Sequence, residues 1–172
     1  MSQGNMSPGD MSQVMPTASA ASRAEVEWTL PKGWKQLPPS EMRLASFSVE
    51  GKEGLKADIS IVVLGGISGG ELANVNRWRG QLNLEPIGES DLSRNTEMIS
   101  PGGRHMLMVD IVSNGPFIDN RYKKRLVAVM HTRGEKIWFF KMTGEDALIR
   151  SVKPSFLRLL ESLRFHDTPP HG

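Results

Sequence analysis

The chain has 172 residues, a formal net charge of +2 and no cysteine. The missing cysteine excludes disulfides, thiolate nucleophiles, zinc–thiolate sites and iron–sulfur clusters. A charge this near neutral gives no general attraction for nucleic acid, and no apolar run approaches the about 18–20 residues of a transmembrane helix.

Composition divides the chain into a tail, a domain and a short second tail. Residues 1–24 are rich in Ser, Gly, Ala, Met and Pro and show no hydrophobic period. Such a segment cannot bury enough apolar surface to offset the entropy cost of ordering. We therefore predict a disordered tether over 1–24, one domain over 25–166 and a disordered tail over 167–172.

Four methionines recur in the tether, at Met1, Met6, Met11 and Met15. Thioether sulfur is a soft ligand, so one interpretation is a site for Cu(I). The interpretation we favour is a linker that happens to use methionine, because no histidine or cysteine accompanies them.

The domain contains runs of strands with segregated helices, a pattern typical of the α+β class. Strands are predicted at residues 26–30, 42–50, 55–64, 104–113, 121–132 and 136–142. Short links join the last three, which predicts an antiparallel meander. Helices are predicted over 69–83 and 143–163. The whole is a mostly antiparallel sheet of about six strands flanked by helices.

The closing helix carries an apolar stripe, formed by Leu148, Ile149, Val152, Phe156, Leu159, Leu160 and Leu163. Thr143 and Asp146 resemble a capping pair at its start. Pro154 is expected to break, kink or restart the helix, because proline removes a backbone donor and clashes one turn back.

The first helix has an apolar arc formed by Leu72, Val75, Trp78 and Leu82. Ser68 and Glu71 have capping-box spacing, so Ser68 is predicted as the N-cap residue. The wheel places Asn74, Arg77 and Gln81 on the opposite, solvent-facing side.

Arg79 falls inside the apolar arc, where a guanidinium needs a partner or must reach water. Asp58 and Asp110, in strand interiors, are the two candidates. We favour an ion pair that fixes the helix on the sheet over a pocket in which Arg79 binds an anion.

The sequence contains few residues in a pattern that would indicate catalysis. Asp58 and Asp110 are the one candidate carboxylate pair for acid–base work, but no nucleophile motif accompanies them. His105 and His131 lie in separate strands, and two histidines without a third ligand are a weak metal signal. We expect no enzyme activity, no metal site and no cofactor.

Two surface segments are candidates for contacts. Residues 120–126 concentrate Arg and Lys around Tyr122, and we favour solvated charges that protect a sheet edge over a nucleic-acid or lipid contact. Residues 114–120 place Phe117 and Ile118 on a loop. They either contact a partner or fold back over the sheet edge.

The segments LPKGW (30–34) and FLRLLESLRF (156–165), around an antiparallel core, resemble the PsbP-like fold, which includes PsbP, Mog-type Ran-binding proteins and DcrB-type envelope proteins. The segments MRLASFSVEG (42–51), LANVNRWRGQLNL (72–84) and WFFKMTGEDAL (138–148) resemble, more narrowly, bacterial envelope lipoproteins of the planctomycete type.

This resemblance covers residues 27 to 165 and implies an α/β/α sandwich. It also implies a lipoprotein signal and its cysteine ahead of Met1, and it transfers no catalytic residue.

The resulting expectation is a monomeric, non-enzymatic binding or accessory module of the periplasm or cell envelope. It would bind a protein or small ligand and touch the membrane only through a removed lipid anchor. Without an upstream export signal, the protein would be cytoplasmic. The alternative function is binding of a small anion or a metal ion, either through Arg79 with Asp58 and Asp110 or, for copper, through the tether methionines.

Overall fold

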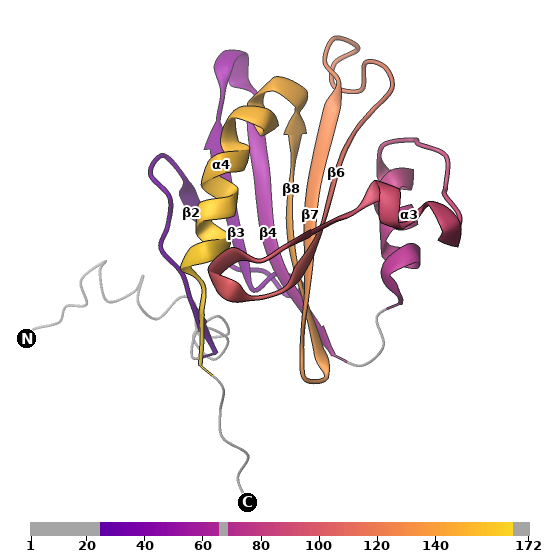
Figure 1. The fold of residues 1–172 in the computed structure, drawn as a ribbon. Coiled ribbons are helices and arrows are strands. Elements are labelled where there is room, and N and C mark those ends of the chain that lie inside the picture. The colour runs from indigo at the N-terminus through magenta and orange to yellow at the C-terminus, as the bar shows by residue number, and fades with distance from the viewer. Residues whose placement is uncertain (1–24, 66–68, 167–172) are drawn as a thin grey trace, which may run out of the picture.

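The computed structural model describes residues 25–65 and 69–166. Within these ranges, seven antiparallel strands form the main sheet in the order β2-β3-β4-β8-β7-β6-β5 (Figure 1). The strands are β2 (Lys35–Leu37), β3 (Ala45–Glu50), β4 (Lys56–Gly65), β5 (Glu97–Ile99), β6 (Met106–Val112), β7 (Lys124–Arg133) and β8 (Lys136–Glu145). The tether and the second tail predicted at the ends lie outside the described residues.

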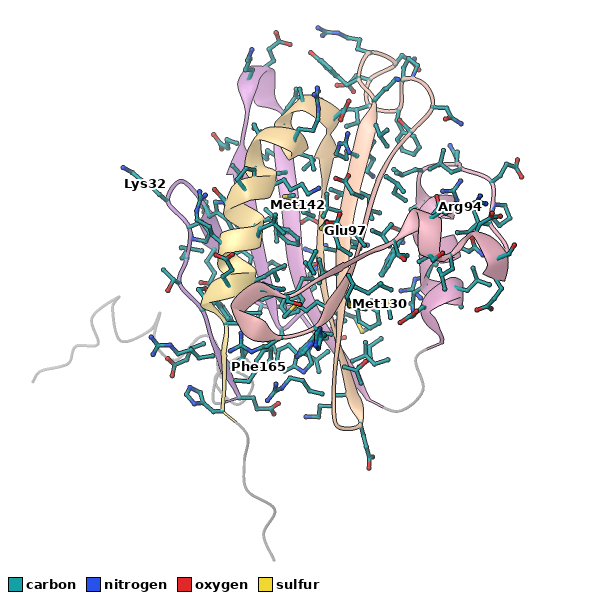
Figure 2. All side chains as sticks on the ribbon, in the orientation of Figure 1. Lys32, Arg94, Glu97, Met130, Met142 and Phe165 are labelled. Carbon is teal, nitrogen blue, oxygen red and sulfur yellow. The ribbon has the colours of Figure 1, made fainter. Side chains whose placement is uncertain are left out.

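The sheet is covered by one helix on each face, α4 (Asp146–Ser162) and α3 (Glu71–Gln81) (Figure 1). Alternate residues of each strand pack under α4 and under α3, because successive side chains in a strand point to opposite faces of the sheet. Met142 lies in the core under α4, and Met130 lies in the apolar cluster under α3 (Figure 2). The predicted α+β class, antiparallel meander and α/β/α layering are confirmed.

Helix α4 packs its predicted stripe on the sheet. Ile149, Phe156 and Leu160 are fully buried. The helix runs without interruption through Pro154, so the predicted break is wrong. Pro154 sits on the exposed side of the helix, where water can reach the carbonyl oxygen that loses its partner.

The start of α4 also differs from the prediction. Thr143 belongs to β8, and the N-cap residue is Glu145. Its carboxylate accepts hydrogen bonds from the amides of Ala147 and Leu148, at 2.7 and 3.0 Å. A carboxylate at this position satisfies two free helix amides and complements the helix dipole.

Helix α3 begins at Glu71 with Gly70 as the N-cap residue, and Ser68, the predicted cap, lies outside the described residues. Trp78 and Leu82 are buried as predicted. Asn74, expected on the solvent side, is fully buried. It is tolerated there because its side chain donates a hydrogen bond of 2.9 Å to the Gly70 oxygen.

Four short strands complete the described part of the fold. β2 and β5 form the two edges of the main sheet and were not predicted. The predicted strand at 26–30 is reduced to β1 (Val26–Glu27), which pairs with β9 (Arg164–Phe165) in a separate two-stranded sheet. This pair joins the two ends of the described chain. None of the described helices is long and apolar enough to cross a membrane.

Candidate functional site

Arg79 does not pair with a sheet aspartate among the described residues. Its Nε donates a hydrogen bond of 2.6 Å to the backbone oxygen of Glu85, in the loop that follows α3. A helical wheel contains only the residues of the helix. It therefore could not predict a partner in the loop after α3, which folds back beside Arg79. Arg79 therefore holds the end of its own helix, and the predicted ion pair is wrong.

Asp58 and Asp110 lie on opposite faces of the sheet. Asp58 is directly opposite Thr143, which is opposite Leu126 of the apolar cluster under α3. Asp110 is opposite Val127, whose side chain lies in the core under α4. Directly opposed residues of antiparallel strands point to the same face. The sheet separates the two carboxylates, so they form no catalytic dyad.

Each aspartate has its own cationic partner. Both oxygens of Asp58 accept from Arg43, at 3.0 and 2.8 Å. Asp110 accepts from Arg125 at 2.5 Å and from Lys153 of α4 at 2.6 Å. Bidentate and doubly paired carboxylates of this kind fix the packing of elements. The structure thus gives both aspartates structural partners within the chain.

His131 of β7 contacts the backbone of His105, which directly precedes β6. Nδ1 of His131 lies 3.0 Å from the backbone oxygen of His105. Among the described residues there is no group of three or more His, Cys, Asp or Glu side chains that would hold a metal ion. The tether methionines, and the Cu(I) interpretation with them, lie outside the described residues.

A pocket of about 620 Å³ opens at the end of the sheet where α4 begins. It is formed by the β3–β4 turn, the β6–β7 loop and the first turns of α4. Its lining residues are Gly51, Lys52, Glu53, Leu55, Tyr122, Glu145, Ala147, Leu148 and Ser151. The volume falls in the range of small-molecule sites, which are mostly apolar with a few placed polar groups.

Two tight turns lie next to the pocket residues Glu53 and Tyr122. In the β3–β4 turn, Glu53 and Gly54 both have positive φ, at 55° and 79°. In the β6–β7 loop, Asp119 and Asn120 also have positive φ, at 52° and 54°. Positive φ at both central residues is the feature of type I′ turns, which suit the twist of hairpins. Both loops therefore have defined shapes.

A side-chain hydrogen bond joins these two turns. The hydroxyl of Tyr122 donates to Glu53 Oε1 at 2.6 Å, and Arg121 Nη2 lies 3.5 Å from the same oxygen. Arg121 also stacks over the Tyr122 ring, 4.8 Å from its centroid. Glutamate is an unusual residue for a left-handed backbone position, and these contacts hold its carboxylate at the pocket rim.

The hydrogen bond between Tyr122 and Glu53 also shifts the pKa values of both side chains. The hydrogen bond from Tyr122 lowers the pKa of Glu53, and the positive charge of Arg121 lowers it further. The same bond raises the pKa of Tyr122. A bond that favours the ionised carboxylate keeps Glu53 as an acceptor at neutral pH.

The apolar part of the lining comes from Leu55, Ala147 and Leu148. Gly51 lets Leu148 approach the β3–β4 turn closely, since a Cβ on Gly51 would lie 3.0 Å from both methyl carbons of Leu148. The amides of the first turn of α4 are already bonded to Glu145, which leaves that helix end with little attraction for an anion. The lining therefore favours an apolar group over a charged one.

Phe117 and Ile118, predicted as contact residues, belong to the same β6–β7 loop as Tyr122. Phe117 is 36% exposed, and Lys124 Nζ lies 5.3 Å from the centroid of its ring. Ile118 is half-buried, and its backbone forms a β-bridge with Tyr122. Sequence reasoning found this loop but missed Glu53 and Leu148, which reach the pocket from distant segments.

No protein-family model matches the chain, and no curated protein matches its sequence. LpqN of Mycobacterium tuberculosis, described as involved in cell envelope biogenesis, is similar in structure with a TM-score of 0.52 and 14% identity; the match covers 83% of each chain. The cyanobacterial PsbP (CyanoP) of Synechocystis sp. PCC 6803 is similar with a TM-score of 0.51 and 15% identity, over 84% of this chain and 89% of CyanoP.

A protein of Bacteroides thetaiotaomicron matches with a TM-score of 0.51 and 12% identity. The match covers 84% of this chain but 46% of that protein, so the chain spans about half its length. At such identities the likeness concerns architecture, not function. With α3 and α4 on the two faces of an antiparallel sheet, and with these structural neighbours, the chain has the PsbP-like fold.

Proposed function

We propose that this protein is a non-enzymatic binding module of the bacterial cell envelope, and that the pocket at the start of α4 is its binding site. The observation that carries the proposal is the pocket itself, which combines about 620 Å³ of space with an apolar lining and a polar rim. Such a site suits an apolar group, on a small ligand or on a partner protein, with one hydrogen-bonding end.

The pocket carboxylates support binding over catalysis. Glu53 accepts from Tyr122, and Glu145 accepts from two helix amides. A general base must be free to reach a substrate proton, and both carboxylates already serve internal hydrogen bonds. We therefore assign the pocket a binding role.

The envelope location rests on structural likeness and on the sequence resemblance. LpqN, which shares the fold, is described as involved in cell envelope biogenesis. A lipid anchor ahead of residue 25 would hold a monomeric domain at a membrane surface without a spanning helix. Fractionation of cells that express the full gene product tests this location, and recovery in the cytosol would contradict it.

The exposed ring of Phe117 extends the proposed contact surface beyond the pocket. It lies on the same loop as the pocket residue Tyr122, and exposed aromatic residues are enriched at contact sites. With Phe117→Ser and Ile118→Ser together, we expect weaker capture of the partner from envelope extracts.

A pocket-filling variant tests the site directly. Ala147 lines the pocket, so Ala147→Phe places a ring in it, whereas Ala73→Phe adds the same ring to the exposed side of α3. With Nile red, a neutral apolar dye, as the probe, we expect the fluorescence enhancement of the wild type to persist in Ala73→Phe and to fall in Ala147→Phe. Equal enhancement in all three proteins would refute the pocket as the binding site.

A further inference from the structure

The face of the sheet that carries α3 changes from apolar to polar partway across. One row of directly opposed residues contains, from β2 to β6, Leu37, Ser46, Ser60, Lys141, Ala128 and Val109. Ala128 and Val109 belong to the cluster under α3. The serines lie on the other side of Lys141, toward β2. Lys141 therefore stands at the border between the two halves.

Lys141 reaches the last turn of α3. Its Nζ lies 3.3 Å from Oε1 of Gln81, the final residue of that helix. The Lys141 side chain is half-buried, and its neighbour toward β2 is Ser60, a buried polar residue. An ammonium group has three donors, so a single long bond to an amide leaves most of its hydrogen-bonding capacity for another acceptor.

Cations outnumber carboxylates around this amine. Burial lowers the pKa of Lys141, and the positive charges of Arg43 and Arg77 lower it further. Asp58 is the one carboxylate that acts in the opposite direction, and Arg43 already binds both of its oxygens. Neither Lys141 nor Arg77 takes part in an ion pair within residues 25–65 and 69–166.

We propose that Lys141, together with Arg77 and the Ser60 hydroxyl, binds a small oxyanion, a phosphate or carboxylate group, between the last turn of α3 and the polar half of the sheet. An oxyanion there supplies the negative charge that the surrounding side chains lack. It also accepts hydrogen bonds from an ammonium group and a hydroxyl at once. This site is separate from the pocket, because it lies on the face opposite α4.

This location replaces the one expected from the sequence. Arg79 donates to a loop carbonyl, whereas the hydrogen-bond partner of Lys141 among the described residues is the Gln81 amide. In a purely structural role, Lys141 would pack its aliphatic stem along the border between the two halves of the sheet and keep its ammonium group in water. The two roles differ in one property: only a binding site makes the response to an anion depend on Lys141, since phosphate also stabilises proteins by exclusion from their surface.

The test compares the wild type with Lys141→Met and with a matched control, Lys136→Met. Lys136 lies at the exposed start of the same strand. Thermal unfolding and calorimetric titration are carried out with inorganic phosphate and, separately, with acetate, against chloride of equal ionic strength. Met keeps the length and apolar stem of lysine, so Lys141→Met is expected to fold.

We expect phosphate to raise the melting temperature of the wild type and of Lys136→Met, and its affinity to fall about ten-fold or more in Lys141→Met. A response to phosphate alone assigns a phosphoryl group, and a response to both anions assigns oxyanions in general. Equal responses of all three proteins, or none above chloride, would overturn the proposal. The dye experiment at the pocket is unaffected by either result.

Discussion

Lys153 of α4 lies 2.6 Å from Asp110 of β6, so a charge pair as well as an apolar stripe holds this helix on the sheet. Arg125 binds the other oxygen of Asp110 and also binds Asp146 in the first turn of α4, at 2.8 Å. The side chains of Asp110 and Arg125 are 21% and 18% exposed. Together they connect two strands with the beginning and middle of α4.

Removing Asp110 should therefore destabilise the fold. Asp110→Ala leaves Arg125 and Lys153 without this partner in a half-buried setting, so we expect a loss of about 2–3 kcal/mol in the free energy of unfolding. Urea denaturation measures it. Asp91→Ala is the control, because Asp91 pairs with the exposed Arg94 and should cost less than about 1 kcal/mol. Equal losses would show that the Asp110 network is not specifically stabilising.

His131 should make the stability depend on pH. Burial lowers its pKa from 6.5, the nearby charges of Arg133 and Arg104 add to this, and the bond to the His105 backbone opposes it. The unfolded chain then takes up a proton more readily than the folded one. The contribution of His131 is fully present above about pH 6.5 and is lost as the pH falls toward the lowered folded pKa.

Urea denaturation at about pH 7.5 and about pH 5 measures this dependence. We expect His131→Gln to have a smaller difference between the two conditions than the wild type. His105→Gln should keep the wild-type difference, because His105 contributes only its backbone oxygen to this contact. The same difference in His131→Gln and the wild type would rule out His131 as its source.

Tyr122→Phe should loosen the β6–β7 loop without affecting the sheet. The hydroxyl is the group that bonds Glu53, and without it the two turns at the pocket separate more easily. Amide hydrogen exchange should become several-fold faster at Arg121 and Tyr122, whose amides bond to the Ile118 oxygen. Exchange at Val127, in the middle of β7, serves as the internal control and should not change.

Lys141→Met should raise the stability in chloride buffer. A half-buried amine with a lowered pKa carries a desolvation cost in its charged form. Removing the charge while keeping the stem is expected to gain about 0.5–1 kcal/mol, a value reduced for the remaining solvent contact. Chemical denaturation measures the gain, and a loss of stability would mean that the amine makes a net favourable contact.

The long elements of the fold were predictable because their patterns are strong. Alternation predicted β4 and the β6–β7–β8 meander, and the stripe through Phe156 predicted α4. β2 and β5 were missed because each has three residues and no buried one, so no apolar pattern marks them. A short edge strand is defined by its partner's backbone rather than by its own side chains.

The candidate site was predictable only in part. Phe117 and Ile118 were found because apolar residues on a loop are visible in one segment. The pocket beside them draws on the turn around Glu53 and on Leu148, which are far from this loop in the sequence. Asn74 was misplaced for a related reason, since its burial depends on a bond to the Gly70 oxygen that a helical wheel does not contain.

The pairing of β1 with β9 places both ends of the described chain at the same end of the domain. The amide of His166 bonds to the oxygen of Glu25 at 2.7 Å, and this junction lies at the end of the sheet opposite the turns that form the pocket (Figure 1). If the domain is attached to a surface through either terminus, the pocket therefore lies at the end of the domain that is farthest from that surface.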